Sequence, residues 1–164
     1  MSMAKLAAER STCLRRKIGS VAVKEDRLQA SGRNGQVSGT PHCKVCIREE
    51  MKIPSGQDTN TCYSVHAEQN LLVQASLHGI NLTNSTIYVT NKPCFTCIKL
   101  LASIKPTAII YADSYPDGMT EQFLLMSNWS AETYTHDDES EYTILRPFES
   151  RNLPLNKLFR GIHI

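Results

Sequence analysis

The sequence predicts an α/β fold, and three neighbouring segments in the middle of the chain indicate it. Residues 66–79 and 94–105 both carry apolar side chains at helical spacing. Between them, residues 85–90 form a β-branched and aromatic run that is typical of a buried strand. A strand between two helices indicates a layered sheet, with the N-termini of both helices at one edge of it.

The other expected elements are less strongly marked. In chain order they are a helix over 4–14, strands over 18–23 and 28–32, a strand over 107–111, a helix over 121–126 and an edge strand over 131–134. A turn over 24–27 would join the first two strands, although no Asn-Gly or Asp-Gly pair marks it. Residues 34–64 show no periodicity, and such a long irregular segment in a compact domain is typically functional or held by cross-links.

Length and composition favour one zinc-dependent domain over 1–164, with a core over 1–135 and a C-terminal tail, 136–164, of unknown role. No apolar run is long enough to span a bilayer, and residues 1–5 lack the apolar core of a signal peptide. The net charge of +2 argues against a dedicated nucleic-acid surface. Six cysteines in a chain without an export signal indicate metal ligands rather than disulfides, and a cytoplasmic location.

The starts of the two central helices carry the residue types of a hydrolytic zinc site. Cys94 and Cys97 lie one helical turn apart, so both sulfurs can face one point, where a helix N-terminus favours thiolates. His66 supplies a nitrogen ligand and leaves the fourth tetrahedral position open for water. Glu68 can stand beside that water as a general acid and base without binding the metal.

Each half of this pattern is ambiguous alone. A single C-x-x-C is shared by redox pairs and structural zinc knuckles, and a single histidine on a helix is commonly a packed surface residue. The joint pattern of His66-Ala67-Glu68, a strand and Pro93-Cys94-x-x-Cys97 matches the signature of zinc deaminases. A purely structural zinc site is the alternative.

A second zinc site is expected in the irregular segment. Its four ligands would be Cys13, Cys43, Cys46 and Cys62, with His42 as a spare ligand. A closed thiolate site would order a loop that has few apolar residues to bury. Ordinary buried or unpaired cysteines are the alternative.

These motifs together resemble the deoxycytidylate deaminases of the cytidine-deaminase superfamily. The resemblance runs from Ala4 to Tyr134 and includes the following stretches: 10–19, Asn34-Gly35, His42-Cys43 with Cys46, 53–56, 62–70, 88–90, 93–97 and 115–117. Three departures from the family pattern are Arg33 before Asn34-Gly35, the short spacing from Cys43 to Cys46, and Ser20 where an alanine is common.

The resemblance implies a three-layer fold with a five-stranded mixed sheet between helices, and a homo-oligomer that is a hexamer or smaller. It implies zinc-dependent hydrolysis of dCMP to dUMP and ammonia, which supplies thymidylate synthesis. It also implies activation by dCTP and inhibition by dTTP, with Mg²⁺ accompanying the triphosphates.

Roles for single residues follow from the same resemblance. Glu68 would carry protons between water, the base and the leaving amine. Four further residues are expected to contact substrate: Asn34 through its amide, Ala67 through its backbone N–H, Thr90 and Tyr115. A 5′-phosphate needs cationic donors, and the candidates are Arg10, Arg15, Arg33 and Arg48.

Other functions fit the sequence less well. A deaminase acting on tRNA or single-stranded DNA needs a basic face, whereas the C-terminal end carries scattered cations among neutral residues. A deaminase of another cytosine nucleotide or nucleoside would use the same zinc site. A non-enzymatic, zinc-stapled nucleotide-binding module would have no use for Glu68, which is not a ligand.

Overall fold

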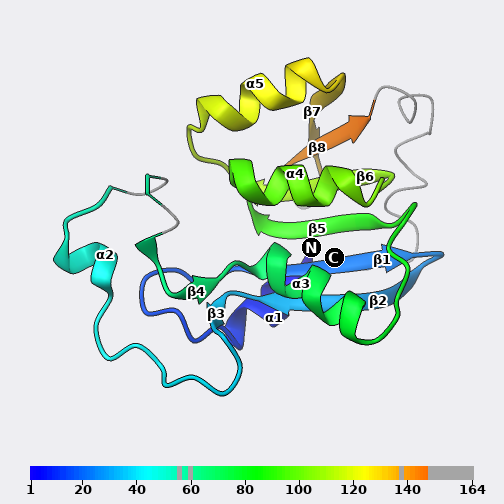
Figure 1. Cartoon of the computed structure of the whole chain (residues 1–164). Coiled ribbons are helices and arrows are strands. Elements are labelled where there is room, and N and C mark those ends of the chain that lie inside the picture. The colour runs from blue at the N-terminus through cyan, green and yellow to red at the C-terminus, as the bar shows by residue number, and fades with distance from the viewer. Residues whose placement is uncertain (55–56, 59–60, 137–138, 148–164) are drawn as a thin grey trace.

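The computed structural model describes residues 1–54, 57–58, 61–136 and 139–147. In chain order these residues form α1 (Ser2–Glu9), β1 (Gly19–Lys24), β2 (Arg27–Arg33), β3 (Gly35–Gln36), α2 (Ile47–Glu50), β4 (Ser64–Val65), α3 (Ala67–Leu77), β5 (Thr86–Asn91), α4 (Phe95–Ser103), β6 (Ala108–Asp113), α5 (Gly118–Met126), β7 (Trp129–Thr135) and β8 (Glu141–Pro147), as Figure 1 shows. None of these helices is long and apolar enough to cross a membrane.

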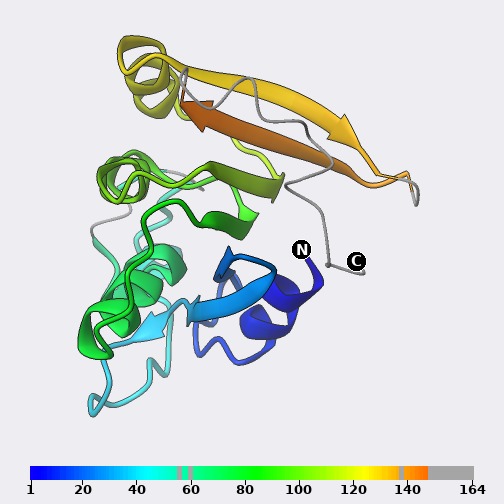
Figure 2. The ribbon, with the colours of Figure 1, turned by 90° about the vertical axis from the view of Figure 1, so that its right-hand side faces the viewer.

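A mixed sheet of six strands, in the order β2-β1-β5-β6-β8-β7, forms the middle layer of the described chain. β5 and β6 run parallel, and every other neighbouring pair is antiparallel. Helices α3, α4 and α5 cover one face, and α1 covers the other (Figures 1 and 2). The expected three-layer α/β class is confirmed, but the sheet has six strands rather than five.

The additional strand is β8, which lies in the segment that the sequence analysis left as a tail. It pairs antiparallel with β6 on one side and with β7 on the other, so the β7–β8 hairpin extends the sheet. Tyr142 and Ile144 are buried, because they point into the layer between the sheet and α1. The expected tail beyond Pro147 lies outside the described residues.

Successive side chains of a strand point to opposite faces of the sheet, and apolar residues on both faces form two cores. In β5, Ile87 and Val89 are fully buried on the face covered by α3 and α4, among residues such as Leu71 and Ile98. Tyr88 packs on the opposite face against α1. Burying one such side chain contributes about 1.5–3 kcal/mol, so both faces hold β5 firmly in the middle of the molecule.

Two details of β1 and β2 fix the start of α3. A Cβ atom at Gly32 would lie 2.1 Å from the carbonyl oxygen of Ala67 and 2.4 Å from the nitrogen of Leu71, so only glycine lets α3 approach β2 this closely. The hydroxyl of Ser20 in β1 donates to the same Ala67 carbonyl at 2.8 Å. The N-terminus of α3 is thereby held at the edge of the sheet.

The other predicted elements are confirmed with shifts of their ends. The first helix ends at Glu9 rather than at residue 14, and the turn after β1 places Glu25 and Asp26 in the left-handed region, with φ of 52° and 58°. Two successive left-handed residues make a tight hairpin turn without glycine. The irregular segment contains the short pair β3–β4 and the four-residue helix α2.

Candidate functional site

His66 stands immediately before α3, where the short strand β4 ends. Its backbone N–H donates to the side-chain oxygen of Gln69 at 3.0 Å, which caps the first turn of the helix. The backbone of His66 is extended, with φ of −71° and ψ of 157°, so the chain turns into the helix at this residue. The imidazole is therefore held at the same edge of the sheet as the N-terminus of α4.

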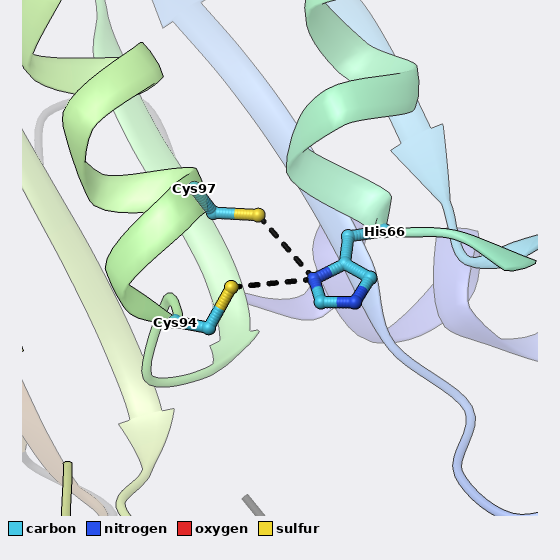
Figure 3. A group of neighbouring side chains, drawn as sticks. All are labelled: His66, Cys94 and Cys97. Carbon is cyan, nitrogen blue, oxygen red and sulfur yellow. Dashed lines mark hydrogen bonds between the residues drawn. The ribbon is translucent and has the colours of Figure 1, made fainter. Parts of the chain in front are cut away.

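Cys94 and Cys97 occupy the N-terminus of α4, directly after Pro93. Cys94 is 7% exposed and Cys97 is fully buried. Nδ1 of His66 lies 3.4 Å from Sγ of Cys94 and 3.4 Å from Sγ of Cys97, as Figure 3 shows. The ligand atoms of these three residues all lie within 4.8 Å of one another, so the predicted group is assembled.

The donor set fits zinc. Two thiols and one imidazole are its preferred ligands, and three protein ligands leave one position open, as in catalytic zinc sites. The pKa values of the two cysteines shift in opposite directions. The hydrogen bond from Cys97 and the neighbouring His66 lower the pKa of Cys94 to about 4, whereas the hydrogen bond with Cys94 and burial raise the pKa of Cys97. The hydrogen bond with Cys94 raises the pKa of His66.

Glu68 lies in the first turn of α3, two residues after the histidine. It is only 4% exposed, and burial raises its pKa to about 7. A carboxyl group with a pKa near neutrality can both accept and give a proton, which is the requirement for general acid and base work at neutral pH. The three-residue metal group consists of His66, Cys94 and Cys97, and Glu68 stands beside it.

A cavity of about 110 Å³ opens above these residues. It is lined by residues from the starts of both helices, from the loop after α1, from the irregular segment and from the loop after β6: Cys13, Arg15, Arg16, Ile18, Asn34, Cys46, Arg48, Cys62, Ser64, His66, Ala67, Glu68, Lys92, Cys94 and Tyr115. The predicted contacts Asn34, Ala67 and Tyr115 are thus brought together around the zinc site. Ala67 is the first residue of α3, so its N–H has no acceptor in its own helix.

Asn34 is more constrained than the sequence analysis expected. Its Oδ1 accepts from the Ser11 hydroxyl at 2.6 Å and from the Ile18 N–H at 2.8 Å, and its Nδ2 donates to the Arg16 carbonyl at 2.8 Å. The amide therefore holds the loop after α1, and one amide hydrogen at most is left for a sugar hydroxyl.

Thr90 does not join the other predicted contacts. It belongs to the face of β5 that Tyr88 also occupies, toward α1, and it lines a separate cavity with Lys17 and Tyr142. Its hydroxyl accepts from the Gly19 N–H at 3.2 Å and donates to Asn91 at 3.2 Å. Strand alternation turns the side chain of Thr90 toward the face covered by α1, so it lies outside the cavity lining that the other three predicted contacts share.

The four cysteines expected at the second site line one small cavity beside the first, but they do not form a closed group. Within the described residues, the His66 group is the one set of three or more potential ligands whose donor atoms approach to 4.8 Å. Sγ of Cys43 instead accepts from the Gln36 amide, and Sγ of Cys62 accepts from the Ser64 N–H at 3.5 Å. All six cysteines are free thiols, and four of them line this cavity: Cys13, Cys43, Cys46 and Cys62.

Two of the four candidate arginines line the cavity, namely Arg15 and Arg48, whereas Arg10 and Arg33 do not. Arg15 donates to the Ile53 carbonyl at 3.0 Å, and Arg48 donates to the Pro54 carbonyl at 3.1 Å. In the described part of the chain, Nη1 of Arg15 and Nε of Arg48 are buried without a hydrogen-bond partner. Buried cationic donors without an acceptor suit an anionic ligand group.

Sequence reasoning missed Lys92, which also lines the cavity although its residue is only 6% exposed. A lysine directly after an apolar strand and before Pro93-Cys94 could have indicated a buried cation at the site. It was overlooked because lysines are nearly always exposed.

Comparison with known proteins gives a consistent picture. Residues 1–113 match the model of the cytidine and deoxycytidylate deaminase zinc-binding region. A deoxycytidylate deaminase of mycobacteriophage D29 is 34% identical over 116 residues, which is 68% of this chain and 89% of that protein. A deoxycytidylate deaminase of Schizosaccharomyces pombe is also 34% identical, over 117 residues, but the matched region spans only 36% of its length and 70% of this chain.

The same relationship is visible in solved structures. The dCMP deaminase of cyanophage S-TIM5, crystallised in complex with dCMP and dUMP, superposes with a TM-score of 0.61 at 28% identity. The superposition covers 74% of this chain and 86% of the phage protein.

Proposed function

The chain belongs to the family of cytidine and deoxycytidylate deaminases, and from this premise we propose that it hydrolyses dCMP to dUMP and ammonia. The observation that carries the proposal is the His66, Cys94 and Cys97 group with the buried carboxyl of Glu68 beside it. The phage relative crystallised with dCMP and dUMP supports the same substrate and product. Such an activity supplies dUMP for thymidylate synthesis.

Zinc would be held by His66, Cys94 and Cys97, and when bound it lowers the pKa of water toward neutrality. Glu68 takes a proton from the attacking water and delivers it to N3 of cytosine. The water oxygen adds to C4, and Glu68 takes the second proton from the hydroxyl now on C4 and gives it to the amino group. The C4–N4 bond then breaks, which releases ammonia and leaves a carbonyl at C4. The pKa of Glu68 near 7 suits both directions of proton transfer.

The remaining cavity residues would orient the nucleotide. The N–H of Ala67 can donate to the pyrimidine carbonyl, and Tyr115 borders the space for the base. Arg15 and Arg48 would bind the 5′-phosphate through the guanidinium N–H groups that have no other acceptor. This assignment predicts that Arg15→Met raises KM for dCMP and leaves turnover of deoxycytidine unchanged.

The proposal has four further parts: a second zinc, regulation by nucleotides, assembly into an oligomer and a cytoplasmic location. A second zinc would draw Cys13, Cys43, Cys46 and Cys62 together from the cavity that they already share. Regulation by dCTP and dTTP with Mg²⁺, and assembly into a homo-oligomer, are proposed on the family resemblance. A cytoplasmic location agrees with six free thiols.

The test is product analysis after incubation of the zinc-loaded protein with dCMP, CMP, deoxycytidine, cytidine and single-stranded DNA. Conversion of dCMP should be fastest, and Glu68→Gln should lower it by about 10²–10⁴-fold while zinc content stays unchanged. Equal turnover of free cytidine would contradict the nucleotide specificity. Loss of zinc from Glu68→Gln would contradict the role of Glu68.

A further inference from the structure

Lys92 is a buried cation with no part in the chemistry described above. Its side chain is 5% exposed, and its Nζ lies 3.0 Å from Oε1 of Glu121 in α5. Burying an ammonium is unfavourable unless it is paired and hydrogen-bonded, so this position requires an acceptor. Lys92 also lines the active-site cavity two residues before Cys94.

Within the described residues, the acceptors of Lys92 lie in one segment, which begins at the last residue of β6 and runs into α5. Besides Glu121, the ammonium donates to the carbonyl oxygen of Tyr115 at 3.4 Å. The backbone N–H of Lys92 donates to the Asp113 carbonyl at 2.7 Å. Lys92 thus forms hydrogen bonds with the segment 113–121 at three places, near its start, in its middle and at its end.

A further hydrogen bond connects the same segment to the residue that follows Pro93-Cys94. The Phe95 N–H, in the first turn of α4, donates to Oδ2 of Asp117 at 3.2 Å. Asp117 also caps α5, because its carboxylate accepts from the Thr120 N–H and hydroxyl. The start of α5 is therefore built onto the start of α4, where the metal ligands lie.

The segment held in this way carries Tyr115, whose side chain forms part of the cavity wall. Tyr115 is half-buried, and burial raises the pKa of its hydroxyl. Nothing else in the loop 114–117 belongs to the cavity lining.

We propose that the Lys92–Glu121 ion pair is a positioning device that sets Tyr115 against the base-binding space, so that nucleotide affinity depends on the docking of α5. This proposal rests on the proposed function, since the ring is taken to border the pyrimidine. Lys92 acts through Tyr115 and contacts no reacting atom.

The test uses the zinc-loaded full chain with the variants Lys92→Met, Glu121→Gln, Tyr115→Ala and the double variant Lys92→Met/Tyr115→Ala. Displacing a positioned group by about an ångström can cost up to about 100-fold, so Lys92→Met should raise KM for dCMP at least tenfold, with kcat within about threefold. Glu121→Gln should raise KM less, because its neutral amide still accepts a hydrogen bond. Lys92→Arg, which keeps the charge and the donors, should restore most of the affinity.

The double variant separates positioning from direct binding. If Lys92 acts through Tyr115, the double variant should have a KM no higher than that of the worse single variant. If the KM increases of the two single variants multiply in the double variant, the proposal is overturned, because Lys92 would then contact the substrate independently of Tyr115. An unchanged KM in Lys92→Met would overturn it as well.

A matched control is Glu132→Gln, which weakens a second ion pair, between Glu132 and buried Arg146 in the β7–β8 hairpin. It should lower the melting temperature without changing KM. A rise in KM equal to that of Lys92→Met would show a general effect of stability and would overturn the proposal.

Positioning is also measurable without turnover, which separates this inference from the proposed function. In protein labelled with ¹³C at tyrosine, the Tyr115 resonance is assigned with Tyr115→Phe. It should move in Lys92→Met and stay in place in Glu132→Gln, even if the wild-type protein fails to deaminate dCMP. A Tyr115 resonance that is unmoved in Lys92→Met would contradict the positioning role.

Discussion

Glu68 shows how one side chain serves function at the expense of stability. Its carboxyl group is buried beside His66, Cys94 and Cys97 at the start of α3, and burial raises its pKa from 4.5 to about 7. A raised pKa means that the folded protein holds a proton which the unfolded chain would release. The same burial that suits proton transfer therefore makes the charged form unfavourable.

This linkage predicts a pH dependence for the metal-free protein. The contribution of Glu68 is fully present below pH 4.5 and is lost as pH rises through 7, and the total loss is about 3 kcal/mol in the free energy of unfolding. Glu68→Gln mimics the protonated form, so its stability relative to wild type should rise over this pH range. Urea unfolding in the presence of a chelator measures the difference.

Ser38→Ala, at an exposed position and without a change in any titratable group, provides the control for this measurement. Its difference from wild type should stay constant with pH. A constant difference for Glu68→Gln too would show that the carboxyl is not held in a raised-pKa environment.

At the scale of elements, the site depends on close contacts between strands and helices. Gly32 in β2 touches the backbone of α3 at Ala67 and Leu71. Gly32→Ala should destabilise the protein by about 1–3 kcal/mol, because backbone atoms must move to admit the methyl group. Since the displaced turn carries His66, zinc affinity should fall as well.

Gly118→Ala is the matched control, because no atom lies within 4 Å of a Cβ at that position, in the first turn of α5. Thermal melting and a competitive zinc titration measure both effects. Unchanged zinc affinity in Gly32→Ala would mean that the position of His66 does not depend on this contact.

The irregular segment is the second element-scale dependence. If Cys43 helps to hold a second zinc, Cys43→Ser should lower the melting temperature by several degrees and raise KM for dCMP. The reason is that Cys13, Cys46 and Cys62 line both the cysteine cavity and the active-site cavity. The zinc content measured by metal analysis should then fall from about two ions per chain to about one.

A native protein with one zinc per chain would contradict the second site, and so would a Cys43–Cys46 disulfide in freshly purified material. Ser38→Ala, in the same segment and exposed, is a control that should leave melting temperature, KM and metal content unchanged.

The order of elements and the central zinc group were predictable, because local patterns determine both. Helical spacing after His66 and after Cys94 defines α3 and α4, and a strand between them fixes their relative placement. The hydrogen bonds of Thr90 and Asn34 were not predictable, because their partners come from distant parts of the chain: Gly19, Ser11, Ile18 and Arg16. The burial of Lys92 was not predictable either, because its partner Glu121 comes near only through tertiary packing.

At the scale of the whole molecule, one apolar core joins almost every element of the sheet. It extends from Ala30 in β2, through Leu71 in α3 and Ile98 in α4, to Trp129 in β7 and Leu145 in β8. The β7–β8 hairpin, which the sequence analysis did not complete, is therefore part of the main core rather than an appendage. The described residues should unfold as one unit.

Trp129 is the single tryptophan of the chain and is 9% exposed, so its fluorescence tests this expectation. The midpoint of urea unfolding measured by fluorescence should coincide with the midpoint measured by far-ultraviolet circular dichroism. An earlier fluorescence transition would show that the hairpin separates first. Tyr142→Phe, which keeps the buried ring in β8, should leave the two midpoints coincident.

The placement of His66 before α3 and of Cys94 and Cys97 at the start of α4 has one more consequence. An ion bound there is a cross-link between residues that are 28 positions apart in the chain, so it closes a loop as a covalent bridge would. Its release requires the bonds from the starts of two core helices to break together. The exchange of zinc with solution should therefore be slow, and its rate would report how often the centre of the molecule opens.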